Sequence, residues 1–129
     1  MSNSILSLIS RIFLAIVFIP AGLQKLMGGI EGTAGYISSV GLPAGTALAW
    51  IAGIFEVAAG IAILVGFQTR IASYLLAAFC LFTGFVFHYL NGGGDQMQMI
   101  MFFKNIGLAG GFLSLAVAGA GGYSVDARR

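Results

Sequence analysis

The sequence predicts an all-α fold: an integral membrane four-helix transmembrane bundle with a short interfacial segment between the first and second helices. Of the 129 residues, 59% are hydrophobic and only 8% are charged, whereas the surface of a soluble domain is typically about 25–35% charged. Four apolar stretches each approach the roughly 20 residues that cross a bilayer. Short polar or glycine-rich connections separate them, so we expect a single transmembrane domain over residues 1–129.

The first two spans are expected at residues 5–27 and 46–66. The first could also be taken for a signal peptide, but no small-residue cleavage site follows it, so we expect a retained helix. Residues 28–45, between the two spans, are too polar and too rich in glycine to cross a membrane. Three apolar positions could form a short amphipathic turn of helix at the membrane interface: Ala34, Ile37 and Val40.

The third and fourth spans are expected at residues 70–90 and 97–118. The loop between them, Asn-Gly-Gly-Gly-Asp at 91–95, is flexible by composition. Because four spans are an even number, both termini and the turn near Arg70 should lie on one side of the membrane. That side would hold four arginines against two lysines on the other, and the positive-inside rule then places both termini in the cytoplasm: Arg11, Arg70, Arg128 and Arg129 against Lys25 and Lys104.

The composition excludes several kinds of site within one chain. Cys80 is the only cysteine, so an intrachain disulfide, a CxxC redox pair and a cysteine-based metal site are all ruled out. The single histidine, His88, rules out a histidine-rich metal centre, and no metal site is expected. No basic patch suits nucleic acid. We expect Cys80 to act as a small apolar side chain against lipid or a neighbouring helix.

One carboxylate, Glu56, stands near the middle of the second span. Burying an acidic residue at that depth costs about 2.5–3.5 kcal/mol on insertion scales, so some other group must offset the cost. Counting along the helices brings Lys25, His88 and Lys104 into the same half of the bundle, one from each remaining span. Gly53 and Gly60 share the helix face of Glu56 and would let another helix approach closely.

Two interpretations of this cluster stay open. Glu56 could form an ion pair with Lys25 or Lys104 that only fixes the helix register. Alternatively, Glu56 and His88 could handle protons as catalytic groups, while four residues bind a ligand: Lys25, Gln24, Lys104 and Asn105. Such a pocket would suit an anion or a reducible carbonyl compound, and a quinone fits in principle. Arg70 is expected to be a topology anchor, and either lysine could instead snorkel to the head groups.

Several short motifs together resemble the DoxX family of small four-helix bacterial membrane proteins. They are Phe18-x-x-x-Gly22-x-x-Lys25-Leu26, Glu56-x-x-x-Gly60, Leu64-x-Gly66-x-x-Thr69-Arg70-x-Ala72, His88, Lys104-Asn105-x-Gly107 and Gly122-x-Ser124-x-Asp126. The resemblance implies a place in the bacterial cytoplasmic (inner) membrane. It also implies similarity to the membrane subunit of a thiosulfate:quinone oxidoreductase, and some members of the family are linked to membrane oxidoreductase complexes in oxidative-stress defence.

The main functional hypothesis is therefore a membrane subunit of a redox system that holds a quinone or similar small ligand at a cluster formed by Lys25, Glu56, His88 and Lys104. The alternative is a non-enzymatic structural or assembly subunit, and a small-solute permease is the third. We expect no intrinsic cofactor. Besides the bilayer, the expected partners are a quinone and either a second protein or further copies of the chain.

Overall fold

The structure, a computed structural model that describes residues 2–128, is all-helical over that range. Four of its helical stretches are long and apolar enough to cross a membrane. They are Asn3–Ser39, Gly45–Val65, Thr69–Leu90 and Gln96–Ala118. The predicted number of spans is thus confirmed, and the last three stretches begin and end within one residue of the ranges expected from the sequence.

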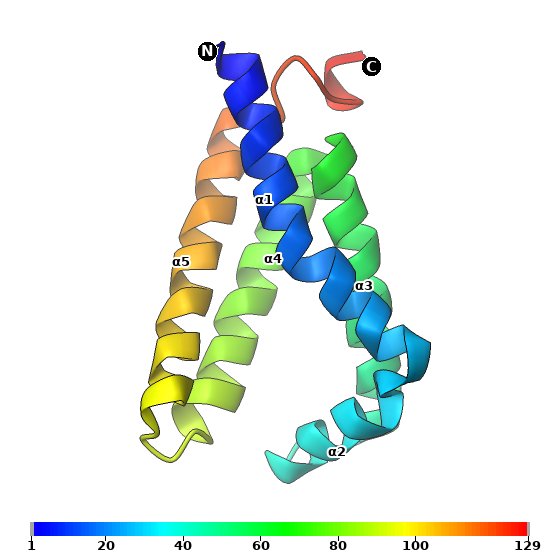
Figure 1. Ribbon diagram of the computed structural model, residues 1–129, viewed down its shortest axis with the longest axis vertical. Helices are drawn as coiled ribbons and strands as arrows, with labels where there is room; N and C mark the ends of the chain where they lie inside the picture. Colours follow the sequence, from blue (N-terminus) through cyan, green and yellow to red (C-terminus); the bar gives the residue numbers. More distant parts are fainter. Residues whose placement is uncertain (1, 129) are drawn as a thin grey trace.

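The helices follow one another in a simple order along the chain (Figure 1). They are α1 (Asn3–Gln24), the π-helical turn η1 (Lys25–Gly29), α2 (Ile30–Ser39), α3 (Gly45–Val65), α4 (Thr69–Thr83), the π-helical segment η2 (Gly84–Leu90), α5 (Gln96–Ala118) and the 3-10 turn η3 (Asp126–Arg128). At α1 and α5 the residue just before the helix caps the N-terminus, where backbone N–H groups lack intrahelical partners. Ser2 accepts a hydrogen bond from Ile5 N at 3.2 Å, and Asp95 accepts one from Gln98 N at 3.3 Å.

The four long helices pack mainly as two pairs. Helix α1 lies along α3, and α4 lies along α5, whereas α3 and α4 contact each other much less extensively. Both termini lie at one end of the bundle, and α2 and the loop that precedes α5 lie at the other (Figure 1). Which end faces the cytoplasm stays a prediction, and labelling a cysteine placed in the 91–95 loop from outside intact cells tests it.

The connection between the first two spans contains a complete helix, α2, rather than a single turn. The chain breaks helical geometry at Met27 and at Gly28, whose φ is +109°. Glycine adopts such an angle without the steric cost that a Cβ would bring. As a result α2 turns beneath the bundle (Figure 1), and the Tyr36 ring lies 4.9 Å, centroid to centroid, from that of Phe87 in η2.

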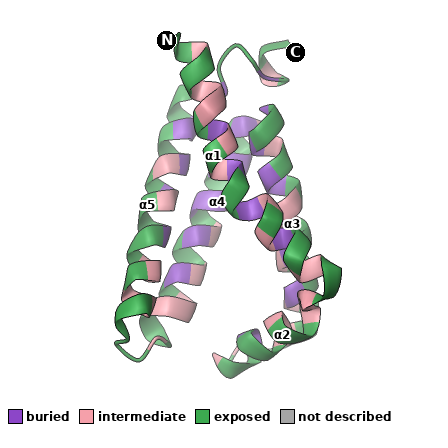
Figure 2. Ribbon diagram, viewed as in Figure 1, coloured by how far each residue is buried: buried purple, intermediate pink, exposed green. Residues whose placement is uncertain are grey.

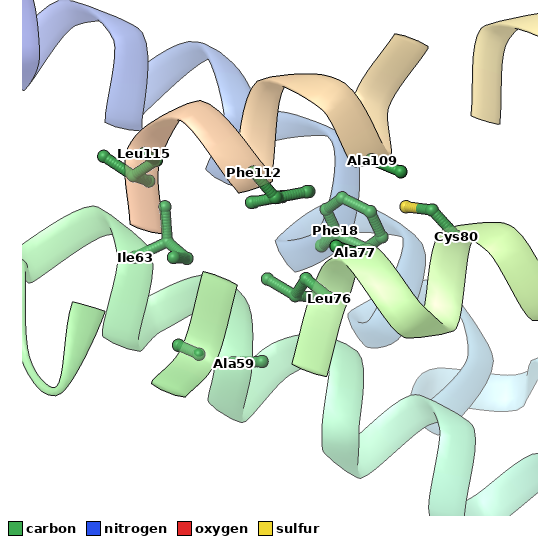
Figure 3. Close-up of a cluster of buried hydrophobic side chains, with 10 residues drawn as sticks. Phe18, Ala59, Ile63, Leu76, Ala77, Cys80, Ala109, Phe112 and Leu115 are labelled. Atoms are coloured by element: carbon green, nitrogen blue, oxygen red, sulfur yellow. The ribbon is translucent and has the colours of Figure 1, made fainter. Parts of the chain in front are cut away.

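Side chains from all four long helices meet in a compact apolar core (Figure 3). Phe18, Ile63 and Phe112 lie in this core, and Phe18 and Phe112 pack with ring centroids 5.5 Å apart. Cys80 is buried in the same cluster as a free thiol, as expected of a small apolar side chain. The outward faces are exposed and largely apolar (Figure 2), which suits a protein surrounded by lipid.

Glycines allow α1 and α3 to approach each other closely. A Cβ on Gly22 would lie 2.8 Å from the carbonyl oxygen of Gly53, and one on Gly60 would lie 2.7 Å from Ile19 Cγ1. At Gly22 the neighbour is backbone, so a larger residue would push the two helices apart, and at Gly60 a larger residue would displace the Ile19 side chain. Gly53 and Gly60 thus both lie where α3 approaches α1 closely, and this close pairing also brings Lys25 to Glu56.

Candidate functional site: a cavity that ends on a buried ion pair

Lys25 and Glu56 form an ion pair across the α1–α3 interface. The Lys25 Nζ atom lies 3.0 Å from Glu56 Oε2 and 3.1 Å from Oε1. Glu56 is 4% exposed, and Lys25 comes from η1, where the chain leaves α1. A Cβ on Gly53, one turn before Glu56, would lie 3.3 Å from Lys25 Cβ, so the absence of a side chain there leaves room for the lysine. Lys25 is thus the residue that offsets the charge of Glu56.

A cavity of about 880 Å³ lies beside this pair, in the half of the bundle that α2 covers. Helices α1, α2, α3 and α4 and the segments η1 and η2 all contribute to its wall. Most lining side chains are apolar. The polar ones come from all six of these elements: Gln24, Lys25, Thr33, Tyr36, Glu56, Thr83 and His88.

The apolar part of the wall opens sideways between α3 and α4. Ile51 on α3 and Leu75 and Phe82 on α4 line the cavity and are nevertheless 61%, 51% and 53% exposed. These residues belong to two neighbouring apolar spans, and α3 and α4 pack against each other less extensively than α1 does against α3 or α4 against α5. In a membrane this opening faces lipid. The cavity is therefore amphipathic, with an apolar entrance and the ion pair as its polar end.

His88 lies on the wall of this cavity, as the sequence predicted, and it has a partner that the sequence did not point to. Its Nδ1 atom lies 2.6 Å from Oε1 of Gln98, in the first turn of α5. Gln24 also lines the cavity, from the last position of α1. The structure thus brings Gln24, Lys25, Glu56 and His88 together around one space.

Lys104 and Asn105 do not line the cavity, which corrects the expectation that they join the ligand-binding group. Lys104 is exposed on α5. Asn105 is 7% exposed and points the other way, because neighbouring residues on a helix are about 100° apart. Its amide Nδ2 donates to the Cys80 carbonyl and to Thr83 Oγ1, each at 3.2 Å. Asn105 therefore joins α5 to α4, and one of its two partners, Thr83, lines the cavity.

Comparisons with known proteins show the family to which the chain belongs. The model of the family described as DoxX matches residues 6–89, a stretch that holds Lys25, Glu56 and His88 and covers more than half of the chain. This chain belongs to the DoxX family. Lys104 and Asn105 lie outside the matched stretch, as they lie outside the cavity.

Two relatives from Escherichia coli (strain K12) extend the similarity over most of this DoxX chain. Inner membrane protein YqjF is 40% identical over 119 residues, which cover 92% of this chain and 88% of YqjF. Inner membrane protein YphA is 41% identical over 130 residues, which cover 98% of this chain and 92% of YphA. No solved structure matches the chain. The chain is thus a DoxX-family membrane protein.

A second polar centre of this DoxX protein, around Arg11, was not predicted. Arg11 is fully buried in α1, and its guanidinium donates to four backbone carbonyls. Nε reaches Ala120 O at 3.0 Å, Nη1 reaches Ile63 O at 3.2 Å and Leu64 O at 2.7 Å, and Nη2 donates to Tyr123 O. Arg11 thereby joins the end of α3 to the C-terminal segment. It is not a free charge at a membrane boundary.

The same C-terminal segment caps the next helix. The Asp126 carboxylate accepts hydrogen bonds from Gln68 N at 2.8 Å and Thr69 N at 2.9 Å, at the start of α4. A carboxylate at a helix N-terminus satisfies otherwise unpaired N–H groups and interacts favourably with the helix dipole. Arg70, the next residue, is exposed at this end of the bundle, away from the cavity. This centre therefore holds the structure together at the end opposite the Lys25–Glu56 pair.

Proposed function

We propose that this protein is the ligand-holding membrane subunit of a redox system, and that the ligand is a quinone or a similar small lipid-soluble carbonyl compound. The observation that carries the proposal is a cavity that opens toward lipid between α3 and α4 and ends on the Lys25–Glu56 pair. An apolar tail would lie along Ile51, Leu75 and Phe82. The polar head would then reach the ion pair and His88.

The chemistry of the polar end suits a carbonyl head group. A lysine ammonium has three N–H donors, and the Glu56 oxygens accept two of them, so one remains for a ligand oxygen. The Lys25 side chain keeps 24% of its surface exposed. The volume of about 880 Å³ falls in the range of roughly 300–1,000 Å³ that small-molecule sites occupy.

In the proposed redox system this chain binds the ligand and transfers protons, and it does not supply electrons. Converting a quinone to a quinol consumes two electrons and two protons. With a single cysteine the chain cannot cycle between a dithiol and a disulfide, so we assign the electron donor to a partner protein. Glu56 and His88, two titratable groups on the cavity wall, are the groups through which protons would pass to the two ligand oxygens.

The runner-up is a structural or assembly subunit in which the ion pair only orders the bundle. The direct contact between Lys25 and Glu56, at 3.0 Å, favours this alternative. A buried ion pair of this kind can have the sole role of fixing how two helices align. The permease hypothesis has less support. A second cavity, of about 590 Å³, lies at the opposite end of the bundle and shares no lining residue with the first, so the described residues form no joined polar path.

The test is native mass spectrometry, with an absorbance spectrum, of protein extracted gently from its membrane. The wild type is expected to carry a quinone-like ligand. Glu56→Gln is expected to lose it while the helical circular dichroism spectrum stays unchanged, because the substitution removes the carboxylate that positions the Lys25 ammonium.

Asn105→Gln is the matched control, since it alters a buried amide outside the cavity wall and should keep the ligand. If neither the wild type nor Glu56→Gln carries a ligand, and the variant also melts at a lower temperature, the cluster is structural and the assembly-subunit hypothesis replaces this one.

A further inference from the structure

We propose that Gln98 is a positioning residue that holds His88 in its Nδ1–H tautomer, so that the Nε2 lone pair faces the cavity and accepts a hydrogen bond from a ligand hydroxyl. The part that concerns the ligand rests on the proposed function. The part that concerns the tautomer rests on the geometry of residues 88–98 alone. The site would then favour the hydroxyl-bearing, reduced form of its ligand.

The tautomer follows from the atoms in contact. His88 Nδ1 lies 2.6 Å from Gln98 Oε1. A side-chain amide oxygen only accepts hydrogen bonds, so the proton of this bond belongs to Nδ1. A neutral imidazole with its proton on Nδ1 has an unprotonated Nε2. Gln98 thereby selects which ring nitrogen is a donor and which is an acceptor.

The loop between η2 and α5 is built so that the two side chains meet. Gln98 is fixed in the first turn of α5, where its backbone N–H donates to the capping Asp95. Gly92 lies in the loop, close to both residues. A Cβ at this position would come 2.7 Å from Gln98 Cβ and would collide with the carbonyl oxygen of His88. Asn91 Nδ2 donates to Val86 O at 2.6 Å. The loop therefore closes tightly between the imidazole and its partner.

The imidazole stands between Gln98 and the cavity. His88 belongs to the cavity wall, whereas Gln98 does not. Among residues 2–128 the bond to Gln98 is the only hydrogen bond of the His88 side chain, which leaves Nε2 available. Lys25 offers an N–H donor to the same cavity. The polar end of the cavity therefore combines one donor, the Lys25 ammonium, with one acceptor, His88 Nε2. A ligand head with one accepting oxygen and one hydroxyl complements this pair.

The sole histidine of the chain makes the tautomer measurable without any ligand. Protein labelled with ¹⁵N-histidine shows one imidazole, and nitrogen chemical shifts distinguish a protonated from an unprotonated ring nitrogen. In nanodiscs at a pH where the ring is neutral, wild type is expected to show a protonated Nδ1 and an unprotonated Nε2. Gln98→Met, of similar length but without the oxygen, should populate the Nε2–H form, and Gln98→Glu, which restores an acceptor, should return the wild-type pattern. A wild-type spectrum with its proton on Nε2, or one that Gln98→Met leaves unchanged, overturns the assignment.

The ligand part is tested with a short-tailed alkylbenzoquinol and its dimethyl ether, which lacks the hydroxyl protons, under anaerobic conditions. Gln98→Met is expected to weaken quinol binding about threefold to tenfold, the equivalent of one hydrogen bond, and to leave the ether unaffected. Gln98→Glu should keep the wild-type affinity. Equal loss for quinol and ether overturns the hydroxyl preference. If the quinol binds no variant while the tautomer shifts as expected, the proposed function fails and the positioning role of Gln98 stands.

Discussion

Replacing Arg11 with methionine is expected to lower the free energy of unfolding by about 3–5 kcal/mol, because several buried or part-buried carbonyls lose a charged hydrogen-bond donor. The substitution removes the donor from four backbone carbonyls, on Ile63, Leu64, Ala120 and Tyr123. Each buried acceptor left unpaired costs about 1–3 kcal/mol. Thermal unfolding in detergent measures the loss, and limited proteolysis should cut the C-terminal segment of the variant first.

Arg70→Met is the matched control, because it removes an exposed arginine at the same end of the bundle. Surface substitutions of this kind usually change stability by less than about 0.5 kcal/mol. Equal melting temperatures for Arg11→Met and Arg70→Met would contradict the role given to Arg11.

The second large effect is expected at the ion pair, and it should be unequal between the two partners. Lys25→Met leaves a carboxylate whose side chain is 6% exposed, whereas Glu56→Leu leaves an ammonium whose side chain is 24% exposed to the cavity. An uncompensated buried charge costs about 3–5 kcal/mol, so we expect Lys25→Met to approach that loss and Glu56→Leu to cost less. Equilibrium unfolding of both variants in one detergent measures the difference.

The double variant, Lys25→Met with Glu56→Leu, distinguishes a ligand-binding role of the ion pair from a purely structural one. Replacing both members of a buried ion pair with apolar residues of similar size is often neutral or stabilising. A double variant as stable as the wild type would show that the pair is not needed for stability, as the ligand-holding role predicts. A double variant as unstable as Lys25→Met would contradict that conclusion and support the structural role.

Most of the fold could be predicted from the sequence because bilayer thickness sets the length of each apolar span. The three later spans matched the structure closely for this reason. The sequence allows two partners for Glu56, Lys25 and Lys104, since a buried carboxylate needs a partner at the same depth. The structure selects Lys25 because Gly22 and Gly53 bring α1 against α3.

The sequence wrongly predicted that Lys104 faces the polar cluster, because the depth of a residue along a helix does not determine which side of the helix it lies on. Counting put Lys104 at the depth of Glu56, but the rotation of α5 turns Lys104 outward and Asn105 inward. Arg11 was missed for another reason. Its partners are backbone carbonyls, which every residue has, so the sequence carries no sign of them. The contribution of α2 to the cavity depends likewise on the turn at Met27 and Gly28.

The central claim is that a lipid-soluble ligand enters between α3 and α4 and reaches the Lys25–Glu56 pair. Photoaffinity labelling in native membranes with a short-tailed azidoquinone, followed by peptide mapping, tests it most directly. Labelling is expected on the α3 and α4 segments that hold Ile51 and Leu75, and excess unlabelled quinone should abolish it. Labelling spread over the outer faces, on exposed positions such as Phe13 and Val117, and unaffected by the competitor, would contradict the claim.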